Sequence, residues 1–210
     1  VQFPKTPLNV PMFLDHAHYV KWVEEQLNQG KMHNERHLWT SVRPNGPERP
    51  HNLNRLELRI CDLVCNVDLL LAITALLELR IINLKNNIKK YDPILSSSKS
   101  QKELAILSDI NDLNVAKSSL DANLSHWKNG EKIKCRDWIR ELLLDVTPLA
   151  QELDMLKLLQ PIESVLNNGN QSMIWLDSYN KGASIKSLLQ QGISEMEREE
   201  TNFIQMKSTY

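Results

Sequence analysis

Residues 55–62 alternate strictly between charged and apolar side chains, and this pattern constrains the fold more than any other stretch of the chain. A period of two predicts a β-strand with one apolar and one polar face. On the polar face two arginines flank one glutamate. Glu57 offers a carboxylate to a divalent cation and Arg59 a guanidinium to a phosphate, a combination that suits phosphoryl transfer. The stretch reads Arg55-Leu56-Glu57-Leu58-Arg59-Ile60-Cys61-Asp62.

The same charged face also has a purely structural interpretation. Charged strands at the edge of a sheet discourage aggregation, and cross-strand ion pairs stabilise sheets. The alternation alone therefore leaves both interpretations open, a solvated or salt-bridged face and an active site.

The composition is that of an ordinary globular protein, with 41% hydrophobic and 24% charged residues among 210. The net charge of −1 gives no general attraction for nucleic acid or an anionic membrane, so neither is expected as a partner. The apolar run at 69–77 is far shorter than the roughly 20 residues that span a bilayer. Cys61, Cys65 and Cys135 lack CxxC spacing, which fits reduced thiols and predicts a cytoplasmic protein.

The chain begins at Val1 rather than at an initiator Met, and no signal peptide follows. We therefore expect a fragment of something longer. Residues 1–210 are then either a single domain or the C-terminal portion of a larger catalytic domain.

The first third of the chain predicts one helix and a pair of strands. A helical pattern runs from Pro11 to about Gln29 and stops at Gly30. Residues 37–43 alternate like a strand that Pro44 ends. Together with the charged strand they predict an antiparallel hairpin within residues 36–62, with Arg43 near the polar end of its partner.

Residues 67–205 predict a helical part, which makes the fold class α+β. Two strands seldom form a stable sheet alone, so their apolar face must rest on the helices or they belong to a larger sheet. The acidic run at 195–200 predicts a solvated helical face. The expected helices cover residues 67–90, 101–127, 135–153 with a kink at Pro148, 155–167 and 185–203.

Four motifs follow one another along the chain: residues 39–44 (Trp-Thr-Ser-Val-Arg-Pro), the strand at 56–62, Asn111 to Ala122 with Lys117 and Leu120-Asp121-Ala122, and Val165 to Asn170 with Gly169-Asn170. In this order they resemble the glutamate–cysteine ligase and carboxylate–amine ligase family, and residues 13–18 and 36–39 look most like its cyanobacterial type. The resemblance covers nearly the whole chain.

The resemblance implies a glutamine-synthetase-like catalytic domain that uses ATP and Mg²⁺. ATP would phosphorylate the γ-carboxylate of glutamate, and the amine of cysteine would attack the acyl phosphate to give γ-glutamylcysteine, the first step of glutathione synthesis. By position, Glu57 would be a metal ligand for Mg²⁺, Arg59 the catalytic contact to the transferring phosphoryl group, and Arg43 a substrate-binding residue.

Some positions depart from the family pattern. Ile110 and Asp112 stand where the family often has Glu and Arg, and Ile174 stands where a basic residue is common. Further acidic metal ligands are expected outside these 210 residues, so we expect the chain alone to be inactive. Two alternatives stay open, a carboxylate–amine ligase for another amine and a non-catalytic helical interaction module. The sequence does not determine the oligomeric state.

Overall fold

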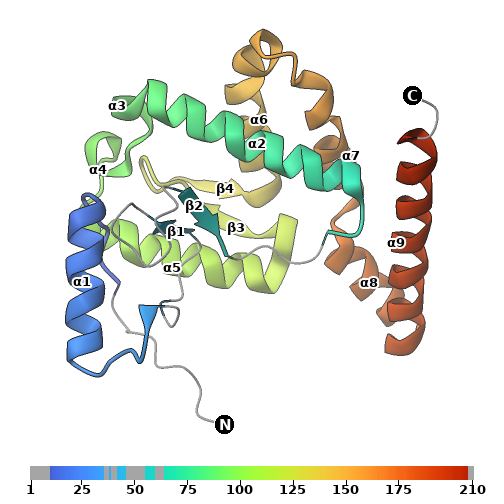
Figure 1. Ribbon diagram of the computed structural model, residues 1–210, viewed down its shortest axis with the longest axis horizontal. Helices are drawn as coiled ribbons and strands as arrows, with labels where there is room; N and C mark the ends of the chain where they lie inside the picture. The colour runs from blue at the N-terminus through green and yellow to red at the C-terminus, as the bar shows by residue number, and fades with distance from the viewer. Residues whose placement is uncertain (1–9, 36–37, 39–41, 46–54, 60–63, 208–210) are drawn as a thin grey trace. The chain divides into compact units, whose positions relative to one another are not determined.

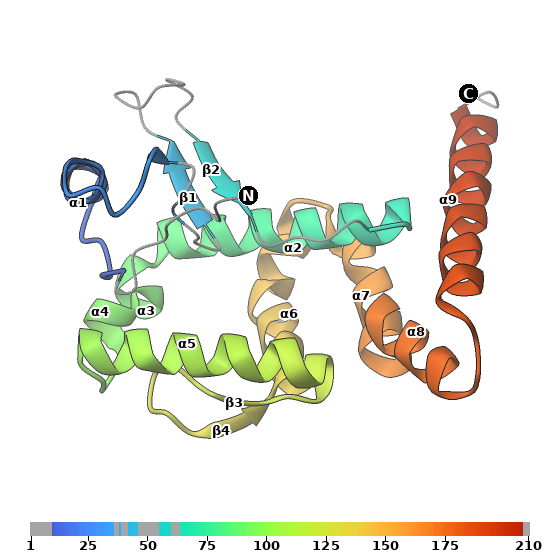
Figure 2. The ribbon, with the colours of Figure 1, turned by 90° about the horizontal axis from the view of Figure 1, so that it is seen from below.

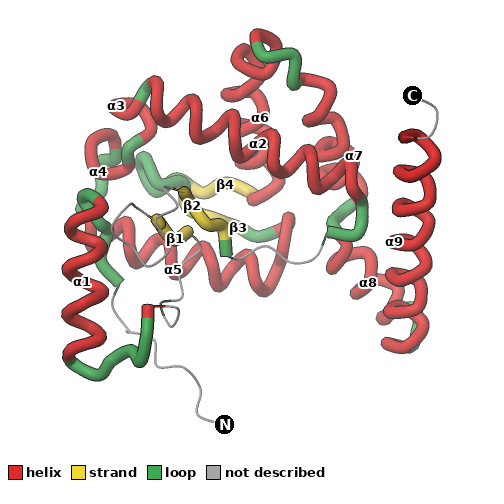
Figure 3. The backbone as a smooth tube through the Cα atoms, in the orientation of Figure 1, coloured by secondary structure: helices red, strands yellow, loops and turns green. Residues whose placement is uncertain are grey.

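The computed structural model describes residues 10–35, 38, 42–45, 55–59 and 64–207. Its contacts divide the chain into two compact units, residues 1–63 and residues 64–210. Within the described residues, helices predominate and the strands form two short antiparallel sheets (Figures 1 and 3). The predicted α+β class is confirmed. None of the described helices combines the length and apolarity needed to cross a membrane.

The first unit is built around helix α1 (His16–Asn28). The Asp15 side chain caps the helix by accepting a 2.7 Å hydrogen bond from the His18 amide. The helix ends just before Gly30, whose φ of +65° favours glycine. The helix was expected from Pro11, and this start is wrong because the cap falls at Asp15. A buried cluster forms on one side: Tyr19, Val23, Met32 and Leu38.

The first sheet of the same unit is a hairpin of β1 (Val42–Asn45) and β2 (Arg55–Leu58). The strands are antiparallel, as the alternation predicted. The expected end of the first strand before Pro44 is wrong, because β1 continues through Pro44. A proline is tolerated at a sheet edge, where its missing N–H leaves no ladder bond unmade. Arg59 follows the end of β2, and residues 60–62 lie outside the described part of the chain.

The core of the second unit lies between α2 (Val67–Asn86), α6 (Cys135–Glu152) and α7 (Gln160–Asn168). Asn66 caps α2 at the Leu69 amide, with a distance of 2.7 Å. The small residues on the inner face of α2 allow α6 and α7 to approach closely. The buried residues of this core are Ala72, Ala75, Leu79, Leu120, Leu143, Val146, Ala150, Leu159, Ile162 and Leu166.

A second hairpin replaces the end of the helix that was expected over residues 101–127. Helix α5 (Gln101–Ser118) stops because Ser119 has a φ of +50°, outside the helical region. A 3-10 turn, η2 (Ser119–Asp121), leads into β3 (Asn123–Ser125), which pairs antiparallel with β4 (Lys132–Lys134). The Asn129-Gly130 pair lies in the connection of this hairpin. Figure 2 shows the hairpin lying along α5.

The remaining elements complete the second unit. The helix expected over residues 67–90 is interrupted at Asn87, and the predicted helix over residues 155–167 begins as a 3-10 turn. Helix α8 was missed, whereas α6 and α9 begin at the expected residues. These elements are α3 (Ile88–Tyr91), α4 (Pro93–Ser96), η3 (Leu156–Leu159), α8 (Gln171–Asn180) and α9 (Ile185–Lys207).

Candidate functional site

The register of the β1–β2 hairpin pairs Arg43 with Glu57. Directly opposed residues of an antiparallel pair share one face of the sheet. In the backbone register Arg43 lies opposite Glu57, Val42 opposite Leu58 and Pro44 opposite Leu56. The sequence predicted that Arg43 lies near the polar end of the second strand, and the backbone register sets it opposite a charged position of that strand.

Arg59 lies beside Glu57 and is anchored to the core of the first unit. Its Nε atom is 3.8 Å from Oε1 of Glu57. Its Nη1 atom donates a 2.6 Å hydrogen bond to the carbonyl oxygen of Leu38, a residue of the buried cluster. A guanidinium held by the backbone loses less conformational freedom when a ligand binds it.

The burial of the hairpin is the reverse of what the alternation predicted. The Glu57 and Arg59 side chains are only 30% and 24% exposed, whereas Leu56 and Leu58 on the apolar face are 55% and 42% exposed. The expectation that this apolar face rests on the helical part or belongs to a larger sheet stays a prediction. The buried cluster of the first unit takes its side chains from α1 and the segment after it, and none from β2.

Glu57 could supply one of the oxygen ligands that a magnesium ion needs. Mg²⁺ is usually held by one or two carboxylates together with phosphate oxygens and water, and Glu57 supplies one carboxylate. Within the described residues, no three His, Cys, Asp or Glu side chains gather closely enough to hold a metal ion. Glu57 would therefore be one of the ligands of the ion, and phosphate oxygens and carboxylates other than those described would supply the rest.

The Asn-containing helix of the family resemblance holds the second hairpin in place. Asn111 on α5 donates from Nδ2 to the carbonyl oxygen of Ser125 at 2.9 Å, and its Oδ1 accepts from the Ser125 amide at 2.8 Å. Asn114 donates to the carbonyl oxygen of Asn123 at 3.0 Å. These amide groups satisfy the backbone of β3, so the contacts of Asn111 in this structure are architectural.

The Leu120-Asp121-Ala122 and Gly169-Asn170 motifs meet in the same region. Asn170 donates from Nδ2 to Oγ of Ser119 at 2.7 Å and caps α8 by accepting from the Met173 amide at 3.1 Å. Leu120 and Ala122 are buried. Two motifs that lie far apart in the sequence therefore meet at the 3-10 turn η2, where Asn170 hydrogen-bonds Ser119.

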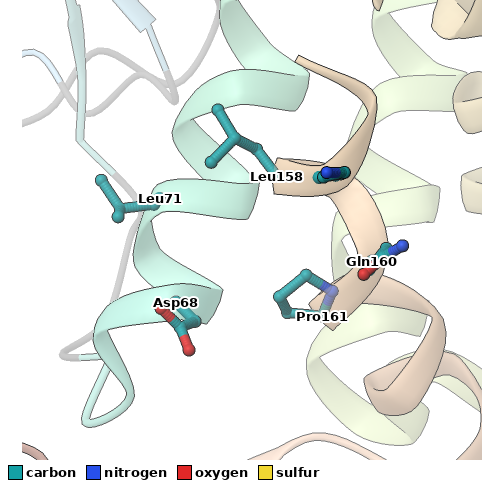
Figure 4. A pocket seen from close by; sticks show the side chains of 6 residues that line it. Asp68, Leu71, Leu158, Gln160 and Pro161 are labelled. Atoms are coloured by element: carbon teal, nitrogen blue, oxygen red, sulfur yellow. The ribbon is translucent and has the colours of Figure 1, made fainter. Parts of the chain in front are cut away.

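A shallow pocket of about 470 Å³ lies elsewhere in the second unit. Figure 4 shows Asp68 and Leu71 of α2 on one side, facing Leu158, Gln160 and Pro161. Lys157 completes the lining. The pocket contains none of the predicted site residues, and its polar groups do not converge on a reacting position.

Among the titratable groups of the second unit with shifted pKa values are His126 and Asp145. Burial lowers the pKa of His126 below its ordinary 6.5; its ring lies 4.9 Å from that of Trp138, and Nδ1 accepts from the Lys128 amide. Burial opposes ionisation of Asp145, but hydrogen bonds from Tyr91 and Lys90 outweigh it and lower its pKa below 3.8. Burial of His126 and the hydrogen bonds of Asp145 explain the two pKa shifts without a catalytic role.

Comparison with known families gives the protein its class. The family model described as glutamate-cysteine ligase family 2 (GCS2) matches residues 2–202, which places the chain among the ligases. The protein belongs to glutamate-cysteine ligase family 2, and the resemblance recognised in the sequence is thereby confirmed. A search among curated proteins found no match to the chain.

Proposed function

We propose that the protein takes part in the ATP-dependent ligation of the γ-carboxylate of L-glutamate to the amine of L-cysteine. Family membership supports a glutamate–cysteine ligase activity in general. The observation that carries the specific proposal is the pairing of Arg43 with Glu57 across the hairpin, with Arg59 held beside Glu57.

The reaction needs two transfers. A γ-carboxylate oxygen of glutamate attacks the terminal phosphorus of ATP, and ADP leaves with the electrons of the broken P–O bond. The cysteine nitrogen then attacks the carbonyl carbon of the acyl phosphate, loses a proton and expels inorganic phosphate. Both steps move negative charge on phosphate oxygens, which fixed cationic groups stabilise.

Each of the three residues has a role that its chemistry allows. Arg59 contacts the transferring phosphoryl group, because a planar guanidinium makes two parallel hydrogen bonds to phosphate. Arg43 binds a carboxylate or phosphate of a substrate. Glu57 is the residue that would hold Mg²⁺, which when bound neutralises part of the charge on ATP phosphates.

The anchoring of Arg59 supports its assignment. The bond from Nη1 to the Leu38 carbonyl ties the guanidinium to the buried cluster, so its position is fixed before substrate arrives. A preorganised cation stabilises a developing charge without the cost of reorganising at the moment of reaction.

The setting proposed for this reaction is the cytoplasm, within a glutamine-synthetase-like catalytic domain. The described thiols Cys65 and Cys135 are free, which suits a reducing compartment. The proposed partners are the three small substrates, and neither nucleic acid nor membrane is among them. None of the three candidate residues is assigned to the amine substrate, so a ligase that uses another amine in place of cysteine is the second candidate.

The test is a ligase assay on the natural protein that carries these residues. Glutamate-, cysteine- and ATP-dependent release of phosphate, with formation of γ-glutamylcysteine, is the expected result. Replacing cysteine by other amines separates the two candidates. Phosphate release with another amine but not with cysteine contradicts the cysteine assignment, and no ATP turnover with any amine contradicts a ligase.

A further inference from the structure

The connection between α4 and α5 is hydrogen-bonded to the connection of the β3–β4 hairpin. Ser97 donates from Oγ to the carbonyl oxygen of Trp127 at 2.6 Å, and the Ser98 amide donates to the carbonyl oxygen of Lys128 at 2.8 Å. The Ser98 hydroxyl donates to the same carbonyl at 3.0 Å. We call these hydrogen bonds the loop contact. Both views place the turn of the hairpin near α4, at the start of α5 (Figures 1 and 2).

The peptide group between Trp127 and Lys128 is held on both of its sides. Its carbonyl oxygen accepts from Ser97, and its N–H donates to Nδ1 of His126 at 3.2 Å. The carbonyl and the N–H of a trans peptide lie in one rigid plane and point in opposite directions. The peptide group therefore cannot turn away from His126 without also moving its carbonyl oxygen away from Ser97.

The hydrogen bond to Nδ1 requires a neutral His126 ring. Nδ1 accepts a hydrogen bond only while it carries no proton, so the proton of the neutral ring lies on Nε2. A proton added to Nδ1 would set two donors against each other, this N–H and that of Lys128. The ring packs against those of Trp127 and Trp138, with centroids 5.6 and 4.9 Å away, which restrains its rotation. Protonation is therefore accommodated by movement of the peptide group rather than of the ring.

The charges around His126 act in both directions. Glu141 on α6 and Glu131 in the hairpin connection favour the charged ring, whereas Lys128 opposes it. Lys99, from the connection between α4 and α5, lies against the same turn of the hairpin. Burial is the largest influence and lowers the pKa of the ring below its ordinary value of 6.5. At neutral pH the ring is therefore uncharged and can accept the Lys128 hydrogen bond.

We propose that His126 is a protonation switch, whose neutral ring keeps the loop contact closed and whose charged ring opens it. A proton passes from solvent to Nδ1, the hydrogen bond from the Lys128 amide is lost, and the peptide group turns away from Ser97. Ser97 Oγ also accepts from the Lys99 amide at 3.0 Å, directly before the N-cap of α5 at Ser100. Opening of the loop contact therefore releases the segment that leads into α5 from the hairpin.

The coupling between the proton and the loop contact is reciprocal, so weakening the contact must make His126 easier to protonate. Ser97→Ala removes the hydroxyl without touching the ring, and it is expected to raise the pKa of His126 toward 6.5. Ser96→Ala is the matched control, because the Ser96 hydroxyl donates to the Asp92 carbonyl within its own helix; it should leave this pKa unchanged. An NMR titration of the His126 ring, from about pH 5 to about pH 8, measures both.

Hydrogen exchange at the Ser98 amide, which donates to Lys128 in the loop contact, follows the opening itself. Its protection, relative to the intrinsic exchange rate at each pH, is expected to fall roughly tenfold, the loss of about one hydrogen bond, with its midpoint at the pKa of His126. His126→Asn supplies an oxygen that can accept from the amide two residues on and does not titrate. This variant is expected to keep Ser98 protected across the whole range.

The amide of Val146, in the buried core of α6, distinguishes local opening from unfolding of the whole unit. Ser98 is expected to exchange faster than Val146 at every pH, and equal protection of the two amides would overturn the proposal. The same fall in Ser98 protection in His126→Asn would overturn it as well, and so would a pKa of His126 that Ser97→Ala leaves unchanged. If His126→Asn does not fold, the titration of Ser97→Ala decides alone.

Discussion

Nη1 of Arg59 donates a 2.6 Å hydrogen bond to the carbonyl oxygen of Leu38, a residue of the buried cluster of the first unit. The same guanidinium lies 3.8 Å from the Glu57 carboxylate. One side chain therefore connects the candidate site to the core that supports it. A substitution at Arg59 is expected to affect both catalysis and stability.

Arg59→Lys is the substitution that separates these two effects. Lysine keeps the charge but loses the planar fork, so we expect a fall in turnover of roughly a hundredfold or more. The free energy of unfolding should fall by about 1 kcal/mol, because the Leu38 carbonyl loses a charged donor. Arg55→Lys, at the start of the adjacent strand β2 and exposed, is the control and should change stability by less than about 0.5 kcal/mol. Normal turnover in Arg59→Lys would remove Arg59 from the mechanism.

Arg43→Lys is expected to act mainly on substrate binding. If Arg43 holds a carboxylate or phosphate equally in the ground state and the transition state, its loss raises KM and leaves kcat nearly unchanged. Steady-state kinetics with glutamate and ATP varied in turn identify which substrate it holds. A lower kcat with an unchanged KM would assign Arg43 to the transition state instead.

The network around Asp145 makes stability depend on acid. Asp145 accepts hydrogen bonds from Tyr91 at 2.7 Å and from Lys90 at 3.0 Å, and Arg80 lies 3.5 Å from its other oxygen. Because its pKa in the folded state is lowered, the stabilisation is present above the ordinary value of 3.8 and is lost as pH falls through the lowered value. Asp145→Asn should remove this loss and lower the free energy of unfolding at neutral pH by about 1 to 3 kcal/mol. Urea unfolding measured from about pH 2 to about pH 7, which includes the range in which carboxylates titrate, gives both the acid-dependent loss and the change in stability at neutral pH. An unchanged acid profile in Asp145→Asn would contradict this account.

A second acid-dependent loss is expected from His126. Its folded-state pKa is lowered by burial, so the unfolded chain binds a proton first and stability falls as pH drops below about 6.5. His126→Phe keeps an aromatic ring beside Trp138 and should remove this loss while the one below 3.8 remains. The same decline below 6.5 in His126→Phe would assign it to another group.

The hydrogen bond from Asn170 to Ser119 predicts that substitutions at Gly169 and Asn170 affect stability rather than catalytic turnover. Gly169 has a φ of +94°, and a side-chain carbon there would approach Cβ of Met173 to 3.3 Å. Gly169→Ala should therefore destabilise the second unit by about 1 kcal/mol. Asn170→Ala should cost about 1 to 2 kcal/mol, because it removes the cap of α8. Both variants should keep their turnover per folded molecule, and a kinetic defect at full stability would give this turn a catalytic role.

The periodic patterns of the sequence predicted those strands and helix starts that depend on neighbouring residues. Alternation at residues 55–58 predicted a strand and its antiparallel partner, and helical periodicity placed the starts of α2, α5, α6 and α9. These signals depend on neighbours a few residues apart. The same reasoning extended α5 to Trp127, because leucine spacing continues past the left-handed backbone of Ser119.

The missed features depend on contacts between distant residues. Asn111 pairs with Ser125, and Asn170 with Ser119, through side chains whose partners no local period reveals. The Asn129-Gly130 pair was a usable signal, because Asn-Gly between short alternating runs is typical of a hairpin. The bond from Arg59 to Leu38 spans 21 residues and was not predictable from the alternation.

Glu57→Gln in the natural protein tests the central claim most directly, because it removes one negative charge and keeps the shape of the side chain. Ligase rates are measured across a Mg²⁺ titration, with melting curves as the control for folding. We predict a loss of about 3 to 4 kcal/mol of transition-state stabilisation, roughly a hundred- to a thousandfold in rate, with a higher Mg²⁺ requirement and a nearly unchanged melting temperature. Near-normal rates at every Mg²⁺ concentration would contradict the account and leave Glu57 as part of a charged sheet face.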